Sequence, residues 1–173
     1  MEEGSTILNP FPQAEDIISL ALKRGVRLAT AESCTGGMVA AALTEIAGAS
    51  SVVECGFVTY SNKSKVNMLG VDDDLISKEG AVSKEVACAM SRGAILQSDA
   101  ELSVAITGIA GPSGGSDEKP VGLVYIASSW HDNSKSEKNK EVCLQYRFEG
   151  GRAQVRQQSV VAALQLLHKQ MVL

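Results

Sequence analysis

Aromatic residues are scarce in this chain, at 4% of 173 residues, although hydrophobic residues as a whole reach 45%. A chain with this length and hydrophobic content is expected to fold around a substantial core, and it does not have the composition of a disordered protein. Because rings are so few, that core must be built mainly from Ala, Val, Leu and Ile.

The sequence also lacks a block of basic residues, and its formal net charge is −4. Binding to a nucleic-acid backbone needs clustered Lys and Arg, so we expect no nucleic-acid partner. No apolar run is long enough to span a bilayer, and the acidic Glu2 and Glu3 do not fit a signal peptide. The sequence therefore predicts a cytoplasmic protein without membrane attachment.

Metal-binding patterns are absent from the sequence as well. The four cysteines are widely spaced and form no CxxC motif, and the only histidines are His131 and His168. Zinc sites need closely spaced Cys and His ligands, so we expect no metal and four reduced thiols. Among the cysteines, Cys34 stands out because it lies in a turn at a helix start, where a thiolate would be stabilised.

Hydrophobic periodicity and Gly/Pro breaks predict helices alternating with strands. The predicted helices are 14–24, 38–47, 62–69, 72–78, 84–97 and 152–169, and the predicted strands are 26–29, 52–60, 102–107, 121–130 and 141–148. Strands separated by helices favour parallel pairing, whereas the last two strands form a hairpin across 131–140. We expect an α/β fold, a three-layer α/β/α sandwich with a mixed, mostly parallel sheet. A single domain spans 13–173, after a flexible arm at 1–12.

The segment 30–37, Thr-Ala-Glu-Ser-Cys-Thr-Gly-Gly, is predicted to turn from the first strand into a helix. Its hydroxyl groups would then lie beside the unpaired N–H groups of a helix start, which hold a phosphate or an oxyanion. The alternative is that Ser33 or Thr35 only caps the helix, with Glu32 favourably placed at its N-terminus. The segment by itself does not separate these interpretations.

Two further segments follow strands, and ligands of covered α/β sheets bind at the carboxyl ends of strands. Tyr60 to Lys65 contains a phenol and two lysines, of which at most one faces the site because they are two residues apart. Thr107 to Gly115 is rich in glycine, which suits either close approach of backbone N–H groups to an anion or a mobile connector. This loop has neither the Walker pattern nor the dinucleotide-binding pattern.

Arg152 and Arg156 begin the last helix four residues apart, so they share a face. They could clamp a phosphate, or they could form an exposed salt-bridged surface. The sequence has no Gly-x-Ser-x-Gly elbow, and neither histidine lies in a candidate loop, which argues against a Ser-His-Asp triad.

In combination, these motifs resemble the CinA C-terminal domain family over roughly residues 13 to 170. The motifs, in chain order, are Ala31 to Gly37, Thr59 to Lys65, Gly80 to Ser83, Thr107 to Pro112, Lys119 to Gly122, and Gly151-Arg152 with Arg156. The resemblance implies that a short chain of this kind is a nicotinamide-nucleotide amidase, which hydrolyses the carboxamide of nicotinamide mononucleotide to the acid and ammonia. It implies no cofactor, a small nucleotide substrate and a homo-oligomer.

Carried over residue by residue, the resemblance implies that Ser33 is the nucleophile. Lys65 is implied to be its base, as the lysine of the Tyr-Ser-Asn-x-x-Lys pattern, in preference to Lys63. Tyr60 is the third catalytic position, as a hydrogen-bond donor to the oxyanion. The positions that bind the substrate and its phosphate are Thr35, Gly36, Thr107, Gly108, Gly111 and Arg152. Three alternatives remain: a cysteine hydrolase using Cys34, a nucleotide-binding module without catalysis, and a competence or damage-inducible protein acting through a partner.

Overall fold

The computed structural model describes residues 11–131 and 140–172 of the chain. The helices in these ranges are α1 Gln13–Arg24, α2 Met38–Thr44, α3 Asn62–Leu69, α4 Asp73–Glu79, α5 Lys84–Leu96 and α6 Arg152–Val172, with a short 3-10 helix at Ala49–Ser51. The strands are β1 Leu28–Glu32, β2 Val53–Val58, β3 Leu102–Gly108, β4 Leu123–Trp130 and β5 Lys140–Arg147.

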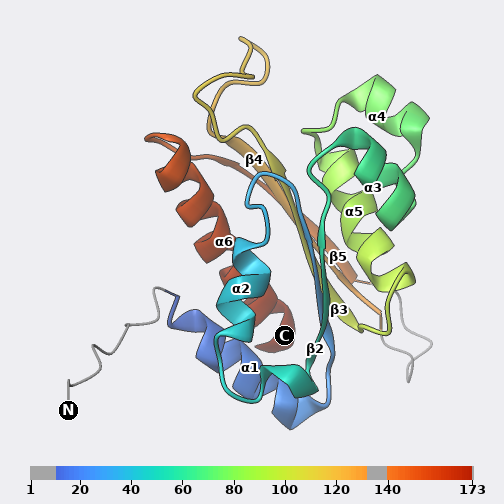
Figure 1. Ribbon diagram of the computed structural model, residues 1–173, viewed down its shortest axis with the longest axis vertical. Coiled ribbons are helices and arrows are strands. Elements are labelled where there is room, and N and C mark those ends of the chain that lie inside the picture. The colour runs from blue at the N-terminus through green and yellow to red at the C-terminus, as the bar shows by residue number, and fades with distance from the viewer. Residues whose placement is uncertain (1–10, 132–139, 173) are drawn as a thin grey trace, which may run out of the picture.

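The strands form one mixed sheet in the order β2-β1-β3-β4-β5. β1 pairs in parallel with both β2 and β3, whereas β4 is antiparallel to β3 and to β5. Helices α1, α2 and α6 cover one face of the sheet, and α3, α4 and α5 cover the other (Figure 1). The predicted α/β/α sandwich with a mixed sheet is therefore confirmed.

Two aliphatic cores lie on the two faces of the sheet. The larger one joins α1, α2 and α6 to the sheet through residues such as Ile17, Leu43 and Leu164. The smaller one joins α3, α4 and α5 to the opposite face and includes Leu69 and Met90. Since β1 is buried along its whole length and β3 along nearly all of it, the segments that leave their carboxyl ends are held firmly.

Several predicted boundaries change in the structure. The first strand runs to Glu32 rather than ending at residue 29, because it is hydrogen-bonded to neighbours on both sides up to that residue. Helix α2 ends at Thr44, shorter than predicted. Of the predicted arm, residues 1–10 lie outside the described part, while Phe11 packs against the larger core and Pro12 directly precedes α1.

The predicted connection 131–140 also falls largely outside the description, at residues 132–139, although the two strands that flank it pair as an antiparallel hairpin. Within residues 11–131 and 140–172, no helix combines the length and apolarity needed to cross a membrane.

Helix α3, which carries Lys65, is positioned by close contact with α5. A Cβ atom added to Gly93 of α5 would lie 2.2 Å from the backbone oxygen of Leu69 and 2.9 Å from its Cβ. Only glycine allows the two helices to approach this closely. The contact fixes the distance between α3 and the rest of its layer.

Replacing Gly93 by alanine tests this contact, because two effects of opposite sign compete. In an open helix the change would stabilise the protein by about 1 kcal/mol. Here the overlap with the Leu69 backbone should dominate, and we expect Gly93→Ala to lower the free energy of unfolding by about 1–3 kcal/mol in urea denaturation. Gln97→Ala, at the exposed end of the same helix, should stay within about 0.5 kcal/mol of wild type. A stabilised Gly93→Ala variant would contradict the close packing.

Candidate active site

The carboxyl ends of β1, β2 and β3 meet at one edge of the sheet, because the three strands are parallel. The segments that leave them there are the turn after Glu32, the segment after Val58 and the glycine-rich loop after Gly108. Helix α6 begins beside the same edge, since Arg152 and Arg156 hydrogen-bond to residues of these segments. All three segments selected from the sequence are therefore brought together.

The carboxylate of Glu32 organises the turn between β1 and α2. It is fully buried and accepts hydrogen bonds from the N–H groups of Gly37, Val39 and Ala40, at 3.0, 3.1 and 2.9 Å. Gly37, at the N-cap position of α2, makes no side-chain capping bond. The prediction that Ser33 or Thr35 caps this helix is therefore wrong, and the start of α2 is not open to an anion because Glu32 already fills it.

Ser33 does not cap α2, and its side chain lies beside that of Lys65. The Nζ atom of Lys65 is 3.1 Å from Ser33 Oγ and 2.8 Å from the carbonyl oxygen of Thr59. The backbone N–H of Ser33 donates to the carbonyl of Ile106 on β3, at 3.0 Å, which anchors the residue to the sheet. A hydroxyl and an amine are thus held within hydrogen-bonding distance by two separate elements.

Lys65 is only 1% exposed, and among the described residues it makes no ion pair. Burial lowers the pKa of its ammonium group below the ordinary value of 10.5, because the charged form loses its hydration. Lys63, by contrast, is exposed on the outer side of α3. The expectation that only one of the two lysines faces the site is met, and the one that faces it is Lys65.

Arg156 binds the turn that follows Ser33 through two backbone carbonyls. Its Nε donates to the carbonyl of Cys34 at 3.1 Å, and its Nη2 donates to the carbonyl of Thr35 at 2.9 Å. Arg156 therefore binds backbone carbonyls and does not form a phosphate clamp with Arg152. In the described part of the chain, no other residue accepts a hydrogen bond from the N–H groups of Cys34 and Thr35.

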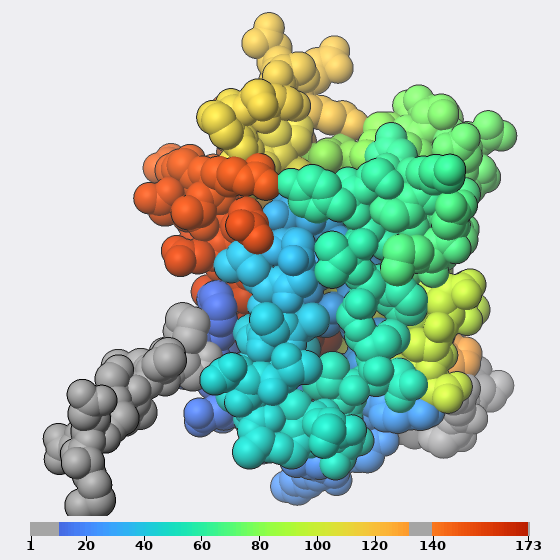
Figure 2. Space-filling view, viewed as in Figure 1, coloured from blue at the N-terminus to red at the C-terminus, as the bar shows by residue number. Residues whose placement is uncertain are grey.

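Arg152 connects the other two segments at this edge. It donates from Nη1 to the carbonyl of Gly111 at 3.0 Å and from Nη2 to the hydroxyl of Tyr60 at 2.7 Å. Figure 2 shows the start of α6 meeting the segment after β2 at the molecular surface. Tyr60 is 61% exposed, and an arginine has five N–H donors, so both side chains retain groups for a ligand.

The remaining predicted positions mainly shape the backbone. Thr107 is buried and donates its hydroxyl to the carbonyl of Ala81 at 2.7 Å. Gly108 approaches β4 so closely that a Cβ atom would lie 2.9 Å from the Leu123 oxygen, and Gly36 adopts a φ of 62° in the turn. The side chain of Thr35 is completely buried, and its hydroxyl has no hydrogen-bond partner in the described part of the chain.

The side chain of Cys34 is part of the larger core, whereas Lys65 hydrogen-bonds to Ser33. Burial raises the pKa of its thiol to about 11, and the nearby Glu32 carboxylate acts in the same direction. The thiol is therefore protonated at neutral pH, whereas a cysteine nucleophile reacts as the thiolate. The geometry favours Ser33 over Cys34 as the nucleophile.

Sequence reasoning missed the role of Glu32 as the cap of α2 and that of Arg156 as a support of the turn. A buried acid at the end of an otherwise apolar strand, followed directly by a turn, was the available signal for Glu32. The shared face of Arg152 and Arg156 was recognised, but the sequence contains nothing to indicate that backbone carbonyls are the partners of the second arginine.

Comparisons with known proteins identify similar chains. A family model described as "CinA C-terminal domain" matches residues 11–171. The nicotinamide-nucleotide amidohydrolase PncC of Escherichia coli K12 is 44% identical over 159 residues, which are 91% of this chain and 93% of that protein. A putative competence-damage inducible protein of Caldicellulosiruptor bescii is 40% identical over 158 residues. That match covers 91% of this chain but only 37% of the longer protein, so the chain spans about a third of such relatives.

Solved structures show the same fold. The competence/damage inducible protein CihA from Agrobacterium tumefaciens has a TM-score of 0.88 and 41% sequence identity, and the match covers 100% of both chains. A CinA superfamily protein from Klebsiella pneumoniae 700603 has a TM-score of 0.84 and 33% identity, with 92% of this chain and 96% of that chain covered.

Replacing Lys65 by methionine tests the free energy cost of burying this amine without an ion pair. Since the folded-state pKa is lowered, the folded protein releases the proton more readily than the unfolded chain, and the burial of Lys65 is most costly below that pKa. We expect Lys65→Met to be more stable than wild type at neutral pH by about 1–3 kcal/mol in urea denaturation. The difference should shrink as the pH rises toward 10.5.

The matched control is Lys63→Met, an exposed position two residues away, where a change within about 0.5 kcal/mol is expected at every pH. A Lys65→Met protein that is less stable than wild type throughout this pH range would mean that the amine is held by favourable interactions in its charged form.

Proposed function

The chain belongs to the CinA C-terminal domain family, and on this premise we propose that it is an amidohydrolase with Ser33 as nucleophile and Lys65 as general base. The substrate is nicotinamide mononucleotide, and the products are nicotinic acid mononucleotide and ammonia, a reaction of pyridine nucleotide salvage. The E. coli relative named as nicotinamide-nucleotide amidohydrolase supports this proposal, because this chain covers nearly all of it.

The observation that carries the proposal is the 3.1 Å contact between Ser33 Oγ and the Nζ atom of the buried Lys65. A serine hydroxyl is a weak nucleophile until a base removes its proton. A lysine can act as that base only when its amine is neutral, and burial lowers the pKa of Lys65 in that direction. A solvated surface lysine beside a serine would not support the same proposal.

In the proposed first step, Lys65 takes the hydroxyl proton of Ser33, and Ser33 Oγ attacks the carboxamide carbon. The carbonyl oxygen then becomes an oxyanion that accepts hydrogen bonds from the N–H groups of Cys34 and Thr35. The Lys65 ammonium returns its proton to the departing nitrogen, so ammonia leaves and an ester with Ser33 remains. Water, deprotonated by Lys65, then attacks this ester, and the Lys65 ammonium returns the proton to the departing Ser33 oxygen as the acid is released.

Arg156 supports the oxyanion donors without contacting the substrate. The carbonyl of Cys34 and the N–H of Thr35 belong to the same peptide group, and Arg156 binds that carbonyl. A cation at the oxygen end of a peptide polarises the group and strengthens its N–H as a donor. Arg156 is therefore a positioning residue for the proposed oxyanion site.

The phosphate of the substrate lies, in this proposal, at Arg152, Tyr60 and the glycine-rich loop. Arg152 is already oriented by Gly111 and Tyr60, and its remaining N–H groups are suited to phosphate oxygens. Binding energy from this remote group would hold the carboxamide against Ser33. The proposed site needs no cofactor. A homo-oligomer and a cytoplasmic location remain predictions from the sequence.

Ser33→Ala is the direct test of the proposed chemistry. With nicotinamide mononucleotide and a chelator present, the wild-type protein should release ammonia, and Ser33→Ala should lower kcat by about 10⁴–10⁶-fold. Substrate affinity, measured by calorimetry, should change little because the phosphate site is intact. The matched control is Ser50→Ala, which removes an exposed hydroxyl from a different segment and should leave both kcat and substrate affinity at the wild-type level.

Four other results would distinguish the alternatives. Full activity in a folded Ser33→Ala protein would rule out the proposed nucleophile. Loss of activity in Cys34→Ala, with Ser33→Ala unaffected, would identify a cysteine hydrolase. If wild type binds the mononucleotide but releases no ammonia, the chain is a binding module, and if it does neither, a role through a protein partner becomes the better explanation.

The two arginines of α6 should affect different kinetic constants. Arg152→Met should raise KM for the mononucleotide by about 10- to 100-fold, as expected for a lost bond to a charged group, and should affect the phosphate-free riboside much less. Arg156→Met should instead lower kcat by about 10²–10³-fold with both substrates, because it weakens the oxyanion donors. Arg147→Met, exposed at the end of β5, is the control. Equal effects of the two changes on KM would contradict this division of roles.

A further inference from the structure

A second set of reactive groups lies away from Ser33, between α5 and β5. Cys88 of α5 and Cys143 of β5 belong to one small cluster with Ala87 and Ala127, on the α5 side of the sheet. Cys143 packs against the part of this cluster that contains Cys88, and the carboxylate of Glu141, which is paired with Arg92, lies close to Cys88. Neither cysteine forms a disulfide in this structure.

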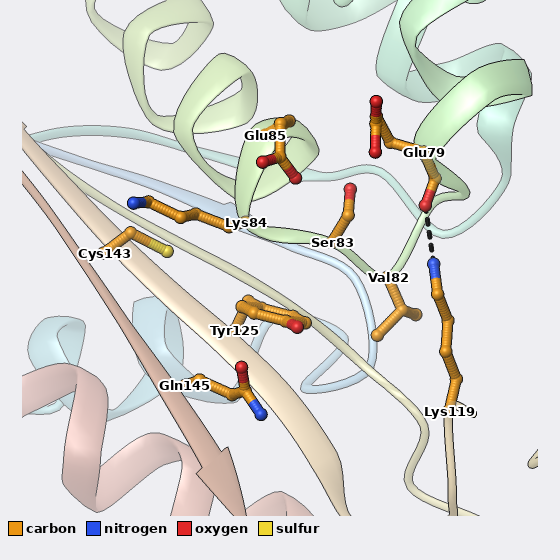
Figure 3. Close-up of a pocket in the computed structure, with 9 residues that line it drawn as sticks. All are labelled: Glu79, Val82, Ser83, Lys84, Glu85, Lys119, Tyr125, Cys143 and Gln145. Carbon is orange, nitrogen blue, oxygen red and sulfur yellow. Dashed lines mark hydrogen bonds between the residues drawn. The ribbon is translucent and has the colours of Figure 1, made fainter. Parts of the chain in front are cut away.

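Cys143 is the accessible member of the pair. It lines a cavity of about 370 Å³ that lies between the start of α5, the end of α4 and strands β4 and β5. Figure 3 shows its sulfur on the cavity wall near the amine of Lys84, with the ring of Tyr125 forming part of the floor. Cys88 is 6% exposed and lies behind it. A small molecule in the cavity would meet Cys143 first.

The surrounding charges distinguish the two thiols. The interaction with Cys88 lowers the pKa of Cys143, and the Lys84 ammonium acts in the same direction, whereas burial, Glu141 and Glu85 oppose the shift. The same interaction, together with burial, raises the pKa of Cys88. Cys143 is therefore the thiol that carries negative charge when one proton is lost. In the described residues no group of three or more His, Cys, Asp or Glu is placed to bind a metal.

We propose that Cys143 is a thiol-oxidation site that reacts with low-molecular-weight disulfides entering this cavity, and that Cys88 resolves the product by forming a Cys88–Cys143 disulfide. The proposal is independent of the amidase reaction, because it uses neither Ser33 nor Lys65. It rests on the contact between the two thiols, the opening of one of them to the cavity, and the charges beside them.

The chemistry proceeds in two exchange steps. The Cys143 thiolate attacks one sulfur of the small disulfide, a mixed disulfide forms, and one small thiolate leaves and takes a proton from water. Cys88 then loses its proton to solvent and attacks Sγ of Cys143, which releases the second small thiolate, and this thiolate takes up a proton from solvent. Two protein thiols are oxidised, and one small disulfide is reduced to two thiols.

The experiment uses the reduced full chain and oxidised glutathione, followed by alkylation and peptide mass spectrometry. Wild type should yield linked peptides that contain Cys88 and Cys143. Cys88→Ser should accumulate a glutathionyl adduct on Cys143, because the resolving thiol is missing. Cys143→Ser should leave Cys88 unmodified, because Cys88 is buried.

Cys55 provides the matched internal control, since it is a partly exposed thiol on β2 whose pKa is raised by burial. Modification of Cys143 should be faster than that of Cys55 by on the order of tenfold, and Cys55→Ser should still form the Cys88–Cys143 link. Equal labelling of Cys55 and Cys143, absence of the adduct in Cys88→Ser, or wild-type reactivity of Cys88 in Cys143→Ser would each overturn the proposal.

Discussion

The hydrogen bond between Lys65 and Ser33 requires two layers of the molecule to be held at a fixed separation. Ser33 leaves the central strand β1, whereas Lys65 belongs to a helix in the layer above the sheet. Burying an amine without an acidic partner is unfavourable, so this contact does not hold α3 in place by itself. The helix must be fixed by other means. These are the capping box at Ser61, the left-handed Gly70 at its end and the backbone contact with Gly93 of α5.

The turn that carries Ser33 is stabilised by opposite charges acting on opposite ends of its peptide groups. The Glu32 carboxylate accepts from three N–H groups at the start of α2, while the Arg156 guanidinium donates to two carbonyls of the turn. Each charged group is stabilised by hydrogen bonds to backbone groups and not by a side chain of opposite charge. The two ions bind other parts of the turn, and in the part of the chain that is described no other residue accepts from the N–H groups of Cys34 and Thr35.

The fold was largely predictable from the sequence, because the elements are strongly patterned. Gly25 and Gly70 end helices with a left-handed residue, Ser83 caps α5, and the apolar run of β3 is buried on both faces, as the composition indicates. The convergence of three loops at one edge followed from parallel pairing. The boundary of β1 failed because polar Thr30 and Glu32 look like turn residues, although both are buried.

The individual contacts of the site were less predictable, since local sequence carries no information about distant partners. Spacing showed that Lys63 and Lys65 face different ways, but the buried one was selected by family resemblance and not by periodicity. Arg156 contacts the carbonyls of Cys34 and Thr35, which lie 122 and 121 residues earlier in the chain. Only the completed sandwich brings α6 beside that turn, and hydrophobic patterns fix the faces of helices without fixing which polar groups meet.

Ser33 and Cys34 illustrate how the fold selects between two adjacent nucleophiles. Successive side chains at the end of a strand point to opposite faces of the sheet. Ser33 therefore faces α3 and meets the amine of Lys65, whereas Cys34 faces the core formed with α1, α2 and α6. Burial keeps the Cys34 thiol protonated, with its pKa raised to about 11, so the intrinsically stronger nucleophile is the less reactive one here. A shift of one residue in the register of β1 would exchange these environments, which is why the pairing of β1 with both of its neighbours up to Glu32 matters for the chemistry.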